Sequence, residues 1–165
     1  MRLYHGSHIA IPSPDVLHSR ARVDFGVGFY TTPILQQAQK WAKRFVTRFG
    51  HGVVSAYDCD AGALSDLKVL DFPSYSDEWL DFVTECRRLP KTAVDGHYDV
   101  IRGGVANDKV FNTCGLYFKG LISKDVALNR LRIEEPNLQL CFKNQVAIAN
   151  CLKFVGSDVV GGFAE

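Results

Sequence analysis

The chain alternates between short strand-like segments and helical segments, and this alternation limits it to a mixed fold. Strands are expected at residues 2–4, 53–59, 67–70, 98–101, 138–142 and 152–160. Helices are expected at residues 33–49, 77–88, 106–118, 123–131 and 144–150. Because no linker, internal repeat or low-complexity segment interrupts the series, the sequence predicts one α+β domain spanning residues 1–165.

Two of the helices carry clear boundary signals. The first has Pro33 in its opening turn and ends at Gly50. Its apolar residues recur every three or four positions: Leu35, Ala38, Trp41, Ala42, Phe45 and Phe49. The helix over 77–88 follows Ser76, a favourable N-cap, and has acidic residues first and arginines last, the order that the helix dipole favours.

Composition removes several function classes. A hydrophobic content of 47% with 22% charged residues is typical of a globular protein, and a net charge of +1 gives no global field for nucleic acid or membrane. The five cysteines include no Cys-x-x-Cys pair, which argues against a disulfide scaffold or zinc site and fits a reducing compartment. Without a leader-like segment after Met1 or an apolar stretch of about 18 residues, a cytoplasmic protein is expected.

The run at residues 26–32, Gly-Val-Gly-Phe-Tyr-Thr-Thr, is the first candidate ligand site. Its Gly-x-Gly turn leads into a short strand and places Tyr30 where the backbone can approach a ligand. Trp41 follows eleven residues later on a helix that returns toward the same place. Two aromatic faces over one slot suit a planar cation such as a nicotinamide ring. The run lacks the third glycine of a dinucleotide-fold fingerprint.

A second candidate is the polar sequence His5-Gly6-Ser7, which is expected to form a turn after the first strand. A histidine there can hydrogen-bond a ribose hydroxyl, and the glycine permits close backbone contact with a carboxamide. By itself the same tripeptide is equally an ordinary turn. His5 and His8 lack further ligands at suitable spacing, so no metal site is expected.

Together these motifs resemble those of the ADP-ribosyltransferases, in the branch of diphtheria toxin and the poly(ADP-ribose) polymerases. The resemblance rests on Leu-Tyr-His-Gly-Ser at 3–7, Gly-Val-Gly-Phe-Tyr at 26–30 and Trp41. Within that family the chain resembles a small bacterial group of uncharacterised domains with Asp-Phe-Gly-x-Gly-Phe-Tyr-x-Thr followed by Gln-Ala-x-x-Trp-Ala, which residues 24–32 and 37–42 match. Residues 105–108 and 137–142 also look like that group.

The resemblance implies a fold of two small antiparallel sheets that form a split core around an NAD⁺ cleft, flanked by helices. His5 would hold a ribose of NAD⁺, Gly6 would pair its backbone with the nicotinamide amide, and Ser7 would support that hold. Tyr30 and Trp41 would sandwich the nicotinamide ring, with Gly28 and Thr31 beside them. NAD⁺ enters as a substrate, and no metal is implied.

The chain departs from the family at the late strand, where active enzymes of this type carry a glutamate and this chain carries Gln139. A carboxylate would stabilise the oxocarbenium character that develops on the ribose, whereas an amide supplies only hydrogen bonds. Asp108 is the first candidate for a displaced carboxylate, with Asp24, Glu134 and Glu135 behind it. Asp108 is equally a helix N-terminal residue favoured by the dipole, and Asn107 a plain N-cap.

The implied activity is transfer of a single ADP-ribose from NAD⁺ to a macromolecular acceptor, protein or nucleic acid, with release of nicotinamide. Small bacterial domains of this family often act as toxins or effectors, which implies an antitoxin or immunity partner and, for an effector, delivery into a target-cell cytosol. An inactive NAD⁺ or ADP-ribose binding module, a partner-binding domain and an NAD⁺ glycohydrolase remain alternatives. The basic helix face formed by Lys40, Lys43, Arg44 and Arg48 is either simply solvated or in contact with phosphates.

Overall fold

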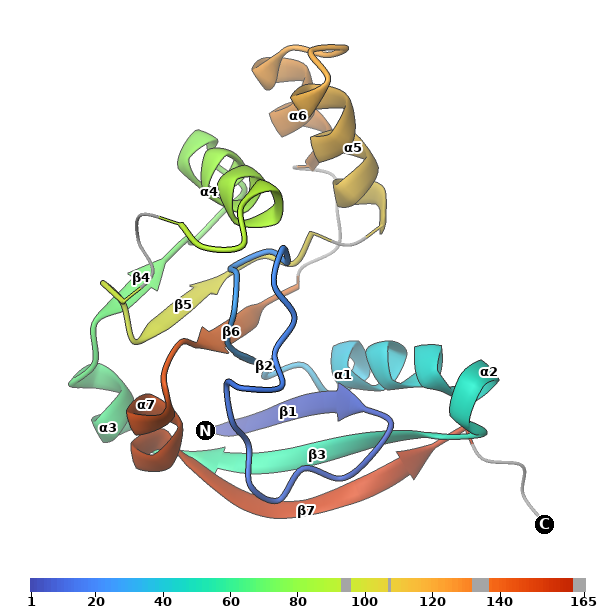
Figure 1. Ribbon diagram of the computed structural model, residues 1–165, viewed down its shortest axis with the longest axis vertical. Helices are drawn as coiled ribbons and strands as arrows, with labels where there is room; N and C mark the ends of the chain where they lie inside the picture. The colour runs from blue at the N-terminus through green and yellow to red at the C-terminus, as the bar shows by residue number, and fades with distance from the viewer. Residues whose placement is uncertain (93–95, 107, 132–136, 162–165) are drawn as a thin grey trace.

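The computed structural model describes residues 1–92, 96–106, 108–131 and 137–161. The described chain is α+β and contains two small sheets (Figure 1). The first sheet has three antiparallel strands in the order β1 (Arg2–Ser7), β3 (Gly52–Cys59) and β7 (Leu152–Val160). It leaves β1 and β7 as the two edges.

The second sheet has four strands in the order β2 (Phe29–Thr31), β6 (Gln139–Phe142), β5 (Val100–Gly103) and β4 (Val69–Asp71). Strands β4 and β5 pair in parallel, so the expectation of two antiparallel sheets is wrong at this edge. The reason is the helix α4 (Asp77–Arg88) between them, because parallel neighbours need a crossover connection.

A β-bridge joins the two sheets through backbone hydrogen bonds. Tyr4 in β1 and Thr32 after β2 exchange N–H to C=O bonds of 2.8 and 2.9 Å. Both sheets and the helix after the last strand of the second sheet bury apolar side chains in one shared cluster. Its buried members are Leu3, Phe29, Tyr57, Cys59, Val100, Leu140, Phe142, Ala147, Ile148 and Cys151. The helix α7 (Gln145–Cys151) supplies the last three of these.

A second cluster lies between the four-stranded sheet and its helices α4, α5 (Asp108–Phe118) and α6 (Lys124–Leu131), which stand together beyond that sheet in Figure 1. Trp79 of α4 and Phe25 of the loop before β2 are fully buried in it. Cys114 and Cys141 lie in this core too. The helix α3 (Ala61–Ser65) lies beside α7.

The helical segment after β2 packs on the three-stranded sheet. It consists of α1 (Leu35–Ala42), the 3₁₀ turn η1 (Lys43–Phe45) and α2 (Val46–Phe49). Glycines in β1 and β3 let its backbone come close: a Cβ on Gly6 would lie 2.4 Å from the Ala38 carbonyl oxygen, and one on Gly52 would lie 2.2 Å from that of Ala42. Any side chain at these two positions would push α1 off the sheet.

Most of the predicted elements are present with shifted ends. The strand 152–160 and the helix 77–88 are confirmed with the same bounds, and Ser76 caps the latter through Oγ, which accepts from the Trp79 N–H at 3.2 Å. The expected turn at His5-Gly6-Ser7 is wrong, because β1 continues to Ser7 opposite Val53. The single helix expected over 33–49 is interrupted by η1, and α3 is not predicted by the pattern.

Candidate functional site

His5 is fixed by β2 on one side and by an aromatic ring on the other. Its Nδ1 lies 2.6 Å from the Tyr30 carbonyl oxygen, and its ring stacks on Phe29 with centroids 4.6 Å apart. A carbonyl only accepts, so Nδ1 carries the proton in the assigned tautomer, and Nε2 is left as an acceptor. Burial lowers the pKa of His5 below its ordinary value, which keeps the ring neutral.

Among the described residues, the backbone N–H and C=O of Gly6 have no hydrogen-bond partner at the edge of β1. In an antiparallel pair, alternate residues point their N–H and C=O groups to the same side. Tyr4 points its groups at Thr32, away from β3, so Gly6 points its own groups to that same side two residues further along. The bridge to Thr32 has ended there. This arrangement suits a carboxamide, which presents one acceptor and one donor side by side.

The Tyr30 hydroxyl closes the turn that precedes β2. It donates to the Gly26 carbonyl oxygen at 2.6 Å and accepts from the Phe25 N–H at 2.9 Å. Gly26 adopts a positive φ of 70°, which glycine tolerates best. Burial raises the pKa of Tyr30 well above its usual range. The hydroxyl is therefore a neutral structural group, and only the half-buried ring is left to contact a ligand.

Gly28, Thr31 and Ser7 are held by close packing and by hydrogen bonds within the protein. A Cβ on Gly28 would lie 2.4 Å from the Cys141 sulfur, and its N–H donates to Ser19 Oγ at 2.8 Å. Thr31 is buried and donates to the Leu140 carbonyl at 3.4 Å. Ser7 is 7% exposed and accepts from the Ile9 N–H at 3.4 Å. These three residues shape the surroundings of His5 and Tyr30.

Trp41 reaches this region from α1. Its Cβ is 3.3 Å from the point that a Cβ on Gly6 would occupy, so the side chain leaves α1 directly beside Gly6. The indole is 39% exposed, and the Arg44 guanidinium carbon lies 4.5 Å from its ring centroid. Arg20, from the loop before β2, lies at 6.0 Å. The fold thus brings the backbone of Tyr30 to His5 and the Cβ of Trp41 to Gly6. The Tyr30 ring packs on Phe25, and the Trp41 ring packs on Arg44.

Gln139 is buried at the start of β6 and uses its amide group structurally. Its Nε2 donates to Asp24 Oδ2 at 2.9 Å and to the Gly104 carbonyl at 3.2 Å. Both amide hydrogens are thereby engaged, and Oε1 is the atom left to accept a hydrogen bond. The side chain of Gln139, which was expected to bind a ribose hydroxyl, is therefore turned toward the carboxylate of Asp24.

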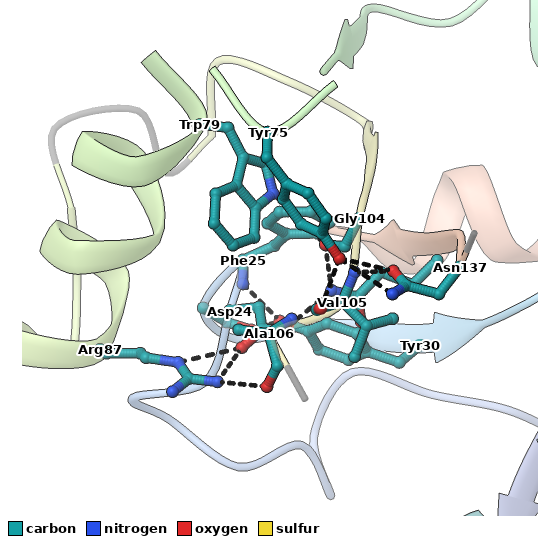
Figure 2. A network of polar contacts seen from close by, with 12 residues as sticks. Asp24, Phe25, Tyr30, Tyr75, Trp79, Arg87, Gly104, Val105, Ala106 and Asn137 are labelled. Atoms are coloured by element: carbon teal, nitrogen blue, oxygen red, sulfur yellow. Dashed lines mark hydrogen bonds and ion pairs between the residues drawn. The ribbon is translucent and has the colours of Figure 1, made fainter. Parts of the chain in front are cut away.

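Asp24 is the centre of a buried polar network (Figure 2). Its carboxylate accepts from the Ala106 N–H at 2.8 Å, from Arg87 Nε at 3.0 Å and from Arg87 Nη2. Asp24 and Arg87 retain side-chain exposures of 9% and 16%. With Gln139 added, both carboxylate oxygens are occupied. Asp24 joins the loop before β2 to α4, to the segment after β5 and to β6.

The same network continues to Asn137 and two aromatic residues. Asn137 Oδ1 accepts from the Val105 N–H at 2.5 Å, and its Nδ2 donates to the Tyr75 hydroxyl at 2.9 Å. The Trp79 indole N–H donates to the Gly104 carbonyl at 3.3 Å, so these side chains converge on one short stretch of backbone (Figure 2). Sequence reasoning missed Tyr75, Trp79 and Arg87: the signal at Trp79 and Arg87 is that of an amphipathic helix, and Tyr75 lies before the N-cap of that helix.

Other sequence candidates have different outcomes. Asp108 begins α5, two residues after the Ala106 that binds Asp24, and its side chain is not described. Asn107, Glu134 and Glu135 lie outside the described residues. Arg102, at the end of β5, pairs with Asp71 through contacts of 2.8 and 2.6 Å.

The larger of two described hollows borders the Gln139 network. It has a volume of about 910 Å³ and lies between the start of α4 and residues Leu128, Leu131 and Asn137. A hollow of about 340 Å³ lies on the far side of Arg102. His5, Tyr30 and Trp41 line neither.

Two further findings concern metal binding and membrane crossing. Within residues 1–92, 96–106, 108–131 and 137–161, no group of three or more His, Cys, Asp and Glu side chains is arranged to hold a metal ion. Among the helices of those same segments, none has both the length and the apolar character that crossing a bilayer requires.

Comparison with known proteins gives one match. A family model described as "Protein of unknown function (DUF3990)" matches residues 1–154. No curated protein and no solved structure matches the chain. The matched range includes His5, Tyr30, Trp41 and Gln139, so all of these candidates lie within the family's own extent.

Proposed function

The chain belongs to the DUF3990 family, and we propose that it is an NAD⁺-dependent mono-ADP-ribosyltransferase with an ADP-ribosyltransferase-like fold. The family description assigns no activity. The proposal rests on the motif resemblance and on one structural observation: Gly6, which follows the neutral His5 on β1, turns its backbone N–H and C=O away from β3 and lies beside the Cβ of Trp41.

In the proposed complex, NAD⁺ binds where β1, β2 and α1 meet. The Gly6 backbone pairs with the nicotinamide carboxamide, and His5 Nε2 accepts a hydrogen bond from a ribose hydroxyl. The nicotinamide ring lies between Tyr30 and Trp41, which requires the Arg44 guanidinium to leave the indole face that it covers in the free protein. A planar cation would then replace a planar cation on the same ring.

The reaction is a substitution at the anomeric carbon. The bond between ribose C1′ and the nicotinamide nitrogen breaks, and its electron pair leaves with neutral nicotinamide. An acceptor oxygen or nitrogen forms the new bond to C1′ and loses its proton. Gln139 Oε1 contributes a hydrogen-bond acceptor to the ribose rather than a full negative charge. One transfer per acceptor, and no chain elongation, is expected.

The neighbouring Asp24 gives a physical reason for a glutamine at position 139, where active ADP-ribosyltransferases of this type carry a glutamate. A glutamate here would face the Asp24 carboxylate at the distance of the present hydrogen bond, 2.9 Å. Two carboxylates this close would not both stay ionised. The same engaged amide favours a second candidate function, a binding module that holds NAD⁺ without cleaving it.

The test is release of labelled nicotinamide from NAD⁺, with cell extract as a source of acceptors. The proposal predicts release together with ADP-ribose label on a macromolecule, and loss of both in His5→Ala and Trp41→Ala. Binding of NAD⁺ without release would establish the binding module instead. Release without label would establish a glycohydrolase. If NAD⁺ is neither bound nor cleaved, the proposal of an NAD⁺ site is refuted altogether.

The pH profile adds a sharper prediction. Because burial lowers the pKa of His5, nicotinamide release should stay level as pH falls through the ordinary histidine value of 6.5. It should decline only at lower pH, when protonation of Nε2 removes the hydrogen-bond acceptor. A profile that breaks at 6.5 or above would show that His5 does not contact the substrate as the neutral imidazole.

A further inference from the structure

The helical segment from α1 to α2 concentrates the positive charge of the chain. Residues 35–49 contain Lys40, Lys43, Arg44 and Arg48 and no aspartate or glutamate. The whole chain has a net charge of +1, so the remainder carries −3. All four cations are exposed. The segment is thus a basic face on a molecule that is otherwise slightly acidic.

Aromatic side chains run along the same segment beside the cations. Lys40, Arg44 and Arg48 are spaced by four residues, and so are Trp41, Phe45 and Phe49, which places the two sets on neighbouring lines of the helix surface. Arg44 lies 4.5 Å from the Trp41 centroid and Arg48 lies 5.1 Å from that of Phe49. Trp41 and Phe49 are each 39% exposed.

A histidine from the strand side extends this aromatic line. The His8 ring stacks on Phe49 at 4.3 Å and tilts against Phe45 at 5.6 Å. The face therefore reaches from α2 back to the loop after β1, which is the strand that carries His5 and Gly6 (Figure 1). At about 1.5 Å per residue the eight residues of α1 span about 12 Å, and η1 and α2 extend the face further, which is enough for several nucleotides.

We propose that this face, defined by Lys40, Trp41, Lys43, Arg44, Arg48 and Phe49, binds single-stranded nucleic acid. Exposed rings interleaved with arginines are the combination that single-strand binders use: cations follow the phosphates and bases stack on the rings. Since Trp41 leaves α1 beside Gly6, the strand would reach the proposed NAD⁺ site and serve there as acceptor. This last step rests on the proposed function, whereas the binding does not.

The observations favour a single strand over two other anionic partners. Paired bases are stacked within a duplex and leave no face for Trp41 or Phe49. An anionic membrane would need a broad apolar face to insert, and here the rings are partly covered by Arg44 and Arg48. Duplex DNA and anionic vesicles therefore enter the test as competitors.

The experiment measures fluorescence anisotropy of labelled DNA and RNA single strands of about twelve nucleotides, a length within known site sizes. The assay contains no NAD⁺. The proposal predicts that the logarithm of the binding constant falls with the logarithm of the salt concentration at a slope near −3, which is about 0.7 for each of four cations. Affinity for the same sequence as a duplex, or for phosphatidylserine vesicles, should be lower.

Two variants and a matched control locate the surface. Lys43→Glu with Arg48→Glu should weaken binding by about tenfold or more. Phe49→Leu keeps the apolar volume but removes the ring, and should weaken binding by about fivefold or more. The control, Lys119→Glu with Arg130→Glu, makes the same charge change at two exposed positions, one in the turn after α5 and one on α6, and should retain binding. Circular dichroism confirms that each variant is folded.

Each result is decisive for one of the two proposals. No binding, equal loss in the control, or stronger binding to duplex or vesicles would overturn the nucleic-acid face. Nicotinamide release measured without nucleic acid tests the proposed function alone. If release occurs and the oligonucleotide binds, label from NAD⁺ on the oligonucleotide establishes it as acceptor, and label on protein alone refutes that role.

Discussion

At the scale of single residues, the candidate site depends on which atoms are already engaged. His5 uses Nδ1 on the Tyr30 carbonyl and keeps Nε2, and Tyr30 uses its hydroxyl on the Gly26 turn and keeps its ring. Gln139 uses both hydrogens of its amide and keeps Oε1. The chemistry open to a ligand is therefore that of acceptors and aromatic faces, with the donor supplied by the Gly6 backbone.

Gln139→Glu tests whether Asp24 excludes a carboxylate at this position. The new side chain would lose the hydrogen bond to Asp24 and place a like charge beside it, so unfolding in urea should show a loss of about 1–3 kcal/mol. The pKa of the introduced carboxyl is raised in the folded state, so the deficit should grow as pH rises and shrink as pH falls below the ordinary glutamate range. Equal stability of variant and parent at neutral pH would contradict this.

Recovery in a double variant serves as the control. Asp24→Asn combined with Gln139→Glu removes the like-charge pair and returns a negative charge to the vicinity of Arg87. If the two carboxylates oppose each other, this double variant is more stable than the sum of the two single changes predicts.

At the scale of elements, the position of α1 is set by two glycines on neighbouring strands. Gly6 and Gly52 let the α1 backbone approach β1 and β3, and this approach is what brings the Trp41 Cβ beside Gly6. The glycine of the His-Gly-Ser motif thus has a packing requirement that exists without any ligand. Its open N–H and C=O are a second property of the same residue.

Gly6→Ala separates these two properties. The added methyl group would lie 2.4 Å from the Ala38 carbonyl oxygen, so α1 must shift, at a cost of about 1–3 kcal/mol in the free energy of unfolding. Gly156→Ala is the matched control, because nothing lies within 4 Å of its added Cβ on β7. Thermal unfolding that lowers Tm equally in both variants would show that the close approach of α1 is not required.

Sequence reasoning predicted the elements better than the contacts between them. The helix over 77–88 has an N-cap, ordered charges and a long apolar stripe, all of which are local. His5-Gly6-Ser7 was predicted as a turn because its polar residues mask a strand whose partner, Val53 to Ser55, lies far along the chain. The Asp24–Arg87 pair spans 63 residues and joins a loop to a helix, so no spacing rule reveals it.

At the scale of the whole molecule, one buried network connects parts that are distant in sequence. Asp24 joins the loop before β2 with α4, the segment after β5 and β6. Asn137 and Tyr75 extend the network to the larger hollow. The two sheets share an apolar cluster, but their backbones meet only at the Tyr4–Thr32 bridge among the described segments.

Asp24→Asn tests the weight of this network. The change removes the carboxylate that accepts hydrogen bonds from Arg87 Nε and Nη2 in a largely buried pair, so we expect a loss of about 3–5 kcal/mol in urea unfolding. Asp71→Asn is the matched control, because its pair with Arg102 is exposed and should contribute less than about 1 kcal/mol. Similar losses in the two variants would show that the burial of Asp24 does not govern its contribution.

The hydrogen bond between Asp24 and Gln139 spans 115 residues and has a consequence for the order of events during synthesis. The ribosome releases His5, Tyr30 and Trp41 early, but β6 and β7 emerge last, and β2 and β3 must pair with them. Long-range pairing of this kind forms slowly and late. A nascent chain would therefore carry the candidate residues His5, Tyr30 and Trp41 long before the sheets that position them are assembled.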